Sequence, residues 1–163
     1  MRYTRHFEVV WDYRNVFLRG ALVTAELTAG ALLLGLVLGL VLGMAKGSRV
    51  RLLRVPATVY IELFRSTPVL VQLVWIYYSM PILMGVQLNS FVSVTIGLGL
   101  NAAAYFAEIF RAGIISIDRG QMDAAKAIGM RYAQAMRRII LPQAIRRMIP
   151  PYINETATLI KLT

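Results

Sequence analysis

A few polar side chains interrupt long apolar stretches of this sequence and are the first candidates for chemistry. They are Glu26, Gln72, Asn101 and Glu108. Polar groups in such segments are costly to bury and usually face the interior of a helix bundle or a substrate pathway. We expect Gln72, Asn101 and Glu108 to be candidates for a pathway, whereas Glu26 is near the end of its stretch and can reach water. Glu108 also has a plainer explanation, because Arg111 follows on the same helix face and can form an ion pair with it.

The sequence offers no set of residues for catalysis or metal binding. Cysteine is absent and the one histidine is His6, so we expect neither a nucleophile constellation nor a metal cluster. No G-x-x-x-x-G-K-[ST] loop occurs, so the chain cannot cradle ATP phosphates by that route. We therefore expect no cofactor in this chain and no enzymatic activity, and energy must come from a partner.

The apolar stretches have the lengths of membrane spans. Only Glu26 is charged in residues 21–43, and residues 66–107 contain no charged residue. At about 1.5 Å per helical residue and a hydrocarbon core of about 30 Å, the first run can cross once and the second twice, with a turn at residues 80–90. A cleaved signal peptide is the alternative for the first run, but the run and its leader are longer than ordinary. The predicted fold is an all-α polytopic integral membrane protein with spans at 21–44, 56–80 and 89–110.

The positive charge of the chain is explained by topology. The net charge is +10, but only 16% of residues are charged, against about 25% in soluble domains. Basic residues gather between the first two spans and after the third, while the turn between the second and third has none. The positive-inside rule places both basic segments in the cytoplasm and the N-terminus outside. The tail 1–20 has a small excess of positive charge, which by itself favours the cytoplasmic side. We interpret this tail as an amphipathic helix on the outer surface. Nucleic acid is not an expected partner.

The first span repeats a small residue at every fourth position. These residues are Ala31, Gly35, Gly39 and Gly43. They share one helical stripe and would allow another backbone to approach closely. Glycine is also common in membrane helices generally, so both explanations stay open. In the second span, Pro68 predicts a kink or a helix start.

Residues 111–151 are too long and too organised for a simple connection. The pattern predicts a short helix over 121–128, a break at Gly129, and a second amphipathic helix over 131–140 that ends near several prolines. Asp123 would lie in the first turn of the short helix, where the helix dipole favours a negative charge. Small side chains on that helix suit insertion into a groove of a partner protein.

This segment carries a family resemblance. The sequence "RAGIISIDRGQMDAAKAIGMRYAQAMRRIILPQAIRRMIPPYINE" closely resembles the cytoplasmic EAA loop of the membrane permeases of bacterial ABC importers, in particular the polar amino-acid uptake group. The stretches "GALVTAELT", "YIELFRSTPVLVQL" and "NAAAYFAEIFRAGI" also look like that group. Asp replaces the usual Glu of the motif, which keeps the charge and shortens its reach. The residues that match the coupling loop are Gly120, Asp123, Ala124, Ala125, Gly129, Ile140, Leu141 and Pro142.

The resemblance implies an ABC importer permease that moves amino acids across the bacterial cytoplasmic membrane. Such a permease has a five-span core, of which this chain would hold three spans, the coupling loop 111–151 and the start of a fourth span at 152–163. The chain is therefore expected to be C-terminally incomplete. Implied partners are a cytoplasmic ATPase that binds ATP and Mg, a second permease subunit, identical or related, and an external solute-binding protein. The alternative function is a non-transporting membrane scaffold that recruits a cytoplasmic partner through the same helix.

Overall fold

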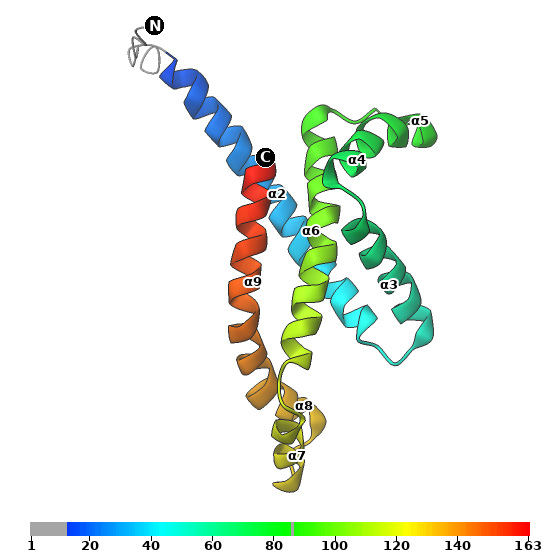
Figure 1. The fold of residues 1–163 in the computed structure, drawn as a ribbon, viewed down its shortest axis with the longest axis vertical. Helices are drawn as coiled ribbons and strands as arrows, with labels where there is room; N and C mark the ends of the chain where they lie inside the picture. The colour runs from blue at the N-terminus through cyan, green and yellow to red at the C-terminus, as the bar shows by residue number, and fades with distance from the viewer. Residues whose placement is uncertain (1–12, 86) are drawn as a thin grey trace, which may run out of the picture.

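The computed structural model describes residues 13–85 and 87–163, and Figure 1 shows their arrangement. These residues contain helices and no strand, which confirms the all-α prediction. The elements η1 and η2 are wide π turns within longer helical segments. In chain order the helices are α2 (Arg14–Lys46), α3 (Arg51–Ser66), α4 (Val69–Val74), η1 (Trp75–Ser79), α5 (Met80–Met84), α6 (Ser90–Ile115), α7 (Arg119–Ala127), α8 (Tyr132–Ala135), η2 (Met136–Ile140) and α9 (Leu141–Leu162).

Helices α2 and α6 pack against each other and run in the same direction. Gly35 of α2 lies against Ala102 of α6, and Gly43 lies against Ala107, so residue numbers rise together along the contact. With 33 residues, α2 is about 50 Å long, which exceeds the hydrocarbon core of about 30 Å. It crosses α6 and α9 obliquely (Figure 1). The predicted tail 1–20 falls partly on this helix, and its first 12 residues lie outside the described part of the chain.

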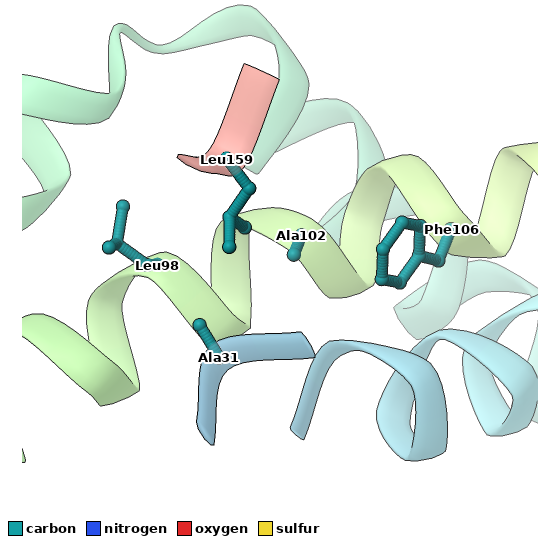
Figure 2. Close-up of a cluster of buried hydrophobic side chains, with 5 residues drawn as sticks. All are labelled: Ala31, Leu98, Ala102, Phe106 and Leu159. Atoms are coloured by element: carbon teal, nitrogen blue, oxygen red, sulfur yellow. The ribbon is translucent and has the colours of Figure 1, made fainter. Parts of the chain in front are cut away.

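Helix α9 runs antiparallel to α6 and completes the core. The rings of Phe106 and Tyr152 stack with centroids 4.7 Å apart, and the hydroxyl groups of Thr28 and Thr163 lie 3.1 Å from each other. Figure 2 shows the buried cluster where the three helices meet. Its members are Ala31, Leu98, Ala102, Phe106 and Leu159. Because most of these side chains are small or flat, the helices can approach closely.

The chain between α2 and α6 must return along the bundle, because those two helices are parallel. It does so as a broken pair, α3 followed by Val69–Met84, bent by 108° at the break. The span predicted over 56–80 falls on this bent pair, which extends from Arg51 to Met84. The expected interruption at Pro68 is confirmed, since Thr67 and Pro68 both adopt extended backbone, as a residue before proline favours. By length and composition, α2, α6 and this bent pair are the candidate spans.

Two residues, Gly85 and Asn89, shape the turn before α6. Gly85 is left-handed at φ 66 and ends α5, a conformation that glycine adopts without strain. The Asn89 side chain accepts a hydrogen bond from the Val92 N–H at 2.8 Å and caps α6. Helix α6 therefore begins at Ser90, next to the predicted start of the third span.

The helical segment that follows α7 is longer than predicted. The prediction that this helix ends near residue 140 was wrong, because α8, η2 and α9 are continuous. In the wide turn η2 the Leu141 N–H bonds to the Met136 carbonyl, and the helix continues past Pro142, Pro150 and Pro151. Helix α9 thus begins before residue 152, where the start of the next span was expected.

The two basic segments lie toward the same end of the bundle. The connection from Lys46 to α3 follows the C-terminal end of α2, and α7 follows the C-terminal end of the parallel helix α6. The uncharged turn between α5 and α6 lies at the other end (Figure 1). This is the charge arrangement expected when both basic segments face one side of a membrane.

Candidate functional site

The short helix α7 is defined by a cap at each end. The Asp118 side chain accepts a hydrogen bond from the Gly120 N–H at 2.6 Å and forms the N-cap. Gly129 is left-handed at φ 81, as predicted for a helix-ending glycine. Its N–H bonds to the Lys126 carbonyl at 2.9 Å, and the Met130 N–H bonds to the Ala125 carbonyl at 3.0 Å. This pair of bonds is a Schellman motif, which ends the helix sharply.

One sequence interpretation of α7 was wrong. The helix begins at Arg119, so Asp123 lies beyond the first turn and Asp118 is the acidic residue at the N-terminus. Asp123 is instead exposed and lies 3.6 Å from the Lys126 ammonium group. The error arose because Arg119 and Gly120 carry no helical pattern of their own.

The residues matched to the coupling loop divide between two faces. Asp123 and Ala124 are exposed, whereas Ala125 is 1% exposed and Ile140 is 4% exposed. Beneath α7, a second core contains Ile117, Ile140 and Ala144, with Met122 packed against it. Gly120, Gly129, Leu141 and Pro142 are exposed. Six of the eight matched residues can therefore reach a partner, and the two buried ones support them.

The α7 element is fixed to the ends of α6 and α9. The Arg147 guanidinium of α9 donates to the carbonyl of Ser116, which ends α6. Met148 packs directly over Gly113 of α6, where any side chain would collide with it. Displacement of α7 would therefore be transmitted to both helices rather than absorbed in a loose loop.

The exposed tip of α7 is partly apolar. Ile128 is 76% exposed and Tyr132 is 64% exposed, and both are near the exposed Ala124 and Ala127 along the chain. A large exposed aliphatic side chain beside small ones is suited to insertion into a groove. The sequence places Ile128 on the presented face of this short helix, directly before Gly129, and its exposure confirms that prediction.

Two clefts lie between the end of α3, helix α6 and helix α9. One has a volume of about 410 Å³ and the other about 580 Å³. Arg65, Tyr105, Glu155 and Thr158 line both. The predicted pathway residues divide among separate surfaces. Asn101 lines the smaller cleft, Glu108 lines the larger one, and Gln72 lines a third, apolar cavity.

Sequence reasoning missed Arg65 and Glu155 as residues of the clefts. The Arg65 guanidinium lies 5.4 Å from the centroid of the Tyr105 ring, within reach of a cation–π interaction. In the sequence, Arg65 belongs to the basic segment between the first two spans, and Glu155 lies where the next span was expected to begin. An ionisable residue in an apolar helix was the signal that could have identified Glu155.

Gln72 and Asn101 form a buried polar contact at the helix break. The Asn101 amide donates to the Gln72 side-chain oxygen at 3.0 Å. The Gln72 amide donates to the Phe64 carbonyl at 2.7 Å and to the Thr67 hydroxyl oxygen at 2.7 Å. Because Phe64 and Thr67 are at the end of α3, these bonds satisfy polar groups that the broken helix leaves free. This geometry gives Gln72 a structural role at the break.

Glu108 is at the centre of an ion cluster. Its carboxylate pairs with Arg111 at 2.8 Å, as predicted, and also with Lys46. Lys46 additionally lies 3.0 Å from Glu62 of α3. Lys46 and Glu108 are each only about 15% exposed, so the cluster joins α2, α3 and α6 where their charges are shielded from water. Glu26 is exposed on α2 and lies outside this cluster.

The four small residues of the predicted stripe on α2 face α6. Ala31, Gly35, Gly39 and Gly43 are buried. A Cβ atom added at Gly35 would lie 2.8 Å from the Ala102 Cβ, and one at Gly43 would lie 2.9 Å from the Ala107 carbonyl oxygen. The close approach of the two backbones therefore depends on the absence of side chains along this stripe.

Comparison with known proteins now identifies the family. Residues 35–163 match the family described as "Binding-protein-dependent transport system inner membrane component". The chain belongs to this family. The resemblance drawn from the coupling-loop motif is confirmed, and so is the expected permease fold.

The relatives of this permease include amino-acid transport proteins. The putative glutamine transport system permease protein GlnP of Rickettsia prowazekii is 42% identical over 144 residues, which cover 88% of this chain and 66% of the relative. The arginine transport system permease protein ArtQ of Bacillus subtilis is 40% identical with the same coverage. The permease thus spans about two thirds of the length of these relatives.

Solved structures agree with this assignment. An amino acid ABC transporter crystallised with histidines matches with a TM-score of 0.89 and 38% identity, over 97% of this chain and 73% of that chain. The MetNI methionine ABC transporter in an inward-facing conformation matches with a TM-score of 0.70 and 24% identity, over 89% of this chain and 70% of that chain. The second match supports the fold alone.

Proposed function

We propose that this permease is the membrane subunit of an ATP-driven importer that moves amino acids across the bacterial inner membrane. Its family and the names of its relatives support this function over a scaffold without transport. The observation that carries the coupling mechanism is α7, a capped helix with one exposed face and one face buried on a core shared with α9.

In this mechanism α7 inserts into a cleft of a separate cytoplasmic ATPase. Asp123 and Ala124 lie on its accessible face, and the exposed Ile128 follows at its end. The ATPase binds ATP and Mg and hydrolyses the nucleotide, and the permease itself carries out no hydrolysis. Closure of the ATPases moves α7, and the contact of Arg147 with the end of α6 transfers this motion to the clefts.

The clefts between α6 and α9 suit a zwitterionic solute. Arg65 carries a positive charge and Glu155 a negative one, and both line the same two clefts. A free amino acid has a carboxylate and an ammonium group that such a pair can recognise. Asn101 and Glu108 each line one of these clefts, which supports their inclusion in the pathway, while the bonds of Gln72 favour a structural role.

The remaining components follow from the function. The segments holding Lys46, Arg51 and α7 face the cytoplasm, and the N-terminus lies outside, as the shared position of the basic segments supports. A second permease subunit completes the pathway, an external solute-binding protein delivers the amino acid, and lipid surrounds the spans.

Crosslinking tests the placement of α7. These 163 residues contain no cysteine, and once any cysteine elsewhere in the complex is replaced, Ala124→Cys introduces a single thiol on the accessible face of α7. We expect a crosslink from this position to the ATPase in the full-length complex. The control is Ile82→Cys, because Ile82 is 82% exposed at the opposite end of the bundle. Crosslinks from Ile82 alone, or uptake of labelled amino acid without the ATPase, would contradict the proposal.

A further inference from the structure

Arg65 is a cleft residue with no carboxylate partner in the part of the chain that the structure describes. It lies in the last turn of α3, is exposed, and lines both clefts between α3, α6 and α9. The ion pairs of the described residues do not include it. Glu155 lines the same two clefts but is not within ion-pair distance of Arg65. The positive charge of Arg65 is therefore available to a ligand.

The ring of Tyr105 is the contact that holds the Arg65 side chain. The guanidinium carbon lies over this ring, 5.4 Å from its centroid, within the range of a cation–π interaction. A guanidinium over a ring interacts through its face, so the N–H groups along its edge stay free. That edge matches a carboxylate, which can accept two parallel hydrogen bonds from it. Tyr105 thus holds Arg65 without using the donors that a ligand needs.

Tyr105 has a rigid position, whereas Arg65 does not. On either side of Tyr105 in α6, Ala104 and Phe106 are 0% exposed, while the Tyr105 ring is partly buried and lines both clefts. Arg65 is exposed at the end of α3, next to the break in the helix pair. A long side chain there populates many rotamers, and ordering it when a ligand binds costs entropy. The fixed ring reduces that cost.

We infer that Tyr105 is a positioning residue for the substrate and acts by holding Arg65 toward the α-carboxylate of an amino acid. This role rests on the proposed function, because it requires that the clefts receive an amino acid. It adds a division of labour between the two residues. Arg65 contacts the carboxylate, and Tyr105 contacts only Arg65. The ring is needed for this role, and the Tyr105 hydroxyl group is dispensable.

Direct binding to the full-length permease complex tests the contact of Arg65 with the carboxylate. The complex is purified in detergent without a binding protein, and the affinities of the common L-amino acids are measured by isothermal titration calorimetry. Those that bind are compared with their α-carboxamides, which lack the negative charge. We expect the wild type to prefer the acid about tenfold to a hundredfold, the value of a hydrogen bond to a charged group. Arg65→Gln should lose this preference.

Two variants of Tyr105 separate its ring from its hydroxyl group. Tyr105→Leu removes the ring, and we expect the acid to bind about threefold to tenfold more weakly, with less discrimination against the amide. Tyr105→Phe keeps the ring and should bind like the wild type. Equal losses in both variants would mean that the hydroxyl group contacts the substrate directly, and would overturn the inference.

A double variant tests whether Tyr105 acts through Arg65. In the Arg65→Gln background, Tyr105→Leu should cause no further loss of affinity, because the side chain that the ring holds is gone. Losses that add would show that Tyr105 affects the substrate independently of Arg65, and would contradict a positioning role.

Tyr60→Leu is the matched control for loss of an aromatic ring where α3 packs on α6. The Tyr60 ring stacks on Phe64 at 4.5 Å, and its hydroxyl group donates to the Leu100 carbonyl at 2.9 Å. Tyr60 lines neither cleft. We expect a lower melting temperature with an unchanged ratio of the affinities for acid and amide. A reduced ratio would show that general packing of α3, and not the Tyr105 ring, positions Arg65.

The wild-type complex separates failure of this role from failure of the proposed function. If the wild type bound no amino acid, both would fail. If it bound amino acids and Tyr105→Leu bound them equally well, only the positioning role would fail. Each variant is compared after a check that it elutes as the intact complex, so that misfolding is not counted as loss of binding.

Discussion

Gly39 of α2 lies so close to Phe106 of α6 that a Cβ atom added to the glycine would be 2.7 Å from the Phe106 Cβ and 3.0 Å from the Ala103 carbonyl oxygen. Gly39→Ala should therefore force α2 away from α6 and destabilise the permease by about 1–3 kcal/mol, the usual cost of overpacking. Thermal unfolding in detergent measures this effect. Gly20→Ala is the control, because nothing lies within 4 Å of a Cβ added at Gly20. If both variants melt alike, the close approach of the two helices is not required.

The carboxylate of Glu108 pairs with Arg111 and with Lys46, and the bundle shields the Lys46 ammonium group from water. Glu108→Gln should destabilise the permease by about 1–3 kcal/mol, because it leaves Lys46 shielded and without its main counter-charge; the value is below that of a fully buried pair because the cluster is partly solvated. Glu62→Gln should cost less than about 1 kcal/mol, since the Glu62 side chain is 63% exposed. Melting temperatures of the two variants provide the comparison.

A double-mutant cycle isolates the interaction of Lys46 with Glu108. Lys46→Met should recover part of the stability lost in Glu108→Gln, because the shielded ammonium group is then absent. If the two losses simply add, the ion pair contributes no coupling, and the cluster cannot be what joins α2 to α6.

The features predicted correctly from sequence depend on neighbours along the chain. The small stripe of α2 repeats every fourth residue, and the left-handed Gly129 directly follows a helical pattern. Pro68 predicts the break after α3 from the residues next to it in the chain. Each signal is complete within one or two helical turns, so it can be interpreted without knowledge of the rest of the fold.

The features that sequence missed depend on residues far apart in the chain. Lys46 and Glu108 meet across 62 positions, and Gln72 and Asn101 meet across 29. No periodicity connects such pairs, because packing of separate helices creates them. The 108° bend between α3 and α4 could not be predicted from the sequence either. Pro68 predicts that the helix is interrupted, but the direction of the bend is set by the contacts of α4 with α6.

The hydrogen bonds of Gln72 predict a loss of stability rather than a change in substrate affinity. Gln72→Leu removes the donors to the Phe64 carbonyl and the Thr67 hydroxyl oxygen at the end of α3. It also removes the 3.0 Å acceptor of the Asn101 amide, which keeps only the Phe64 carbonyl at 3.5 Å. Each unsatisfied buried group costs about 1–3 kcal/mol. We expect a lower melting temperature, with the KM of the remaining folded transporter unchanged. Val71→Ala is a control from the neighbouring exposed position. A changed KM at full stability would instead assign Gln72 to the substrate pathway.

The left-handed backbone at Gly129 predicts a specific failure of coupling. Gly129→Ala places a side chain at φ 81, at a cost of about 1–2 kcal/mol for a non-glycine residue. The Schellman bonds that end α7 then weaken, so α7 loses its fixed orientation toward the ATPase. We expect ATP hydrolysis by the assembled complex to continue with a severalfold loss of amino-acid uptake. Gly85→Ala is the matched control, because Gly85 is also left-handed, at φ 66, but is at the opposite end of the bundle. Amino-acid uptake and ATP hydrolysis are measured in proteoliposomes for both variants. The same uncoupling in both would show that backbone strain anywhere in the permease disrupts transport. In that case α7 would have no special role in coupling.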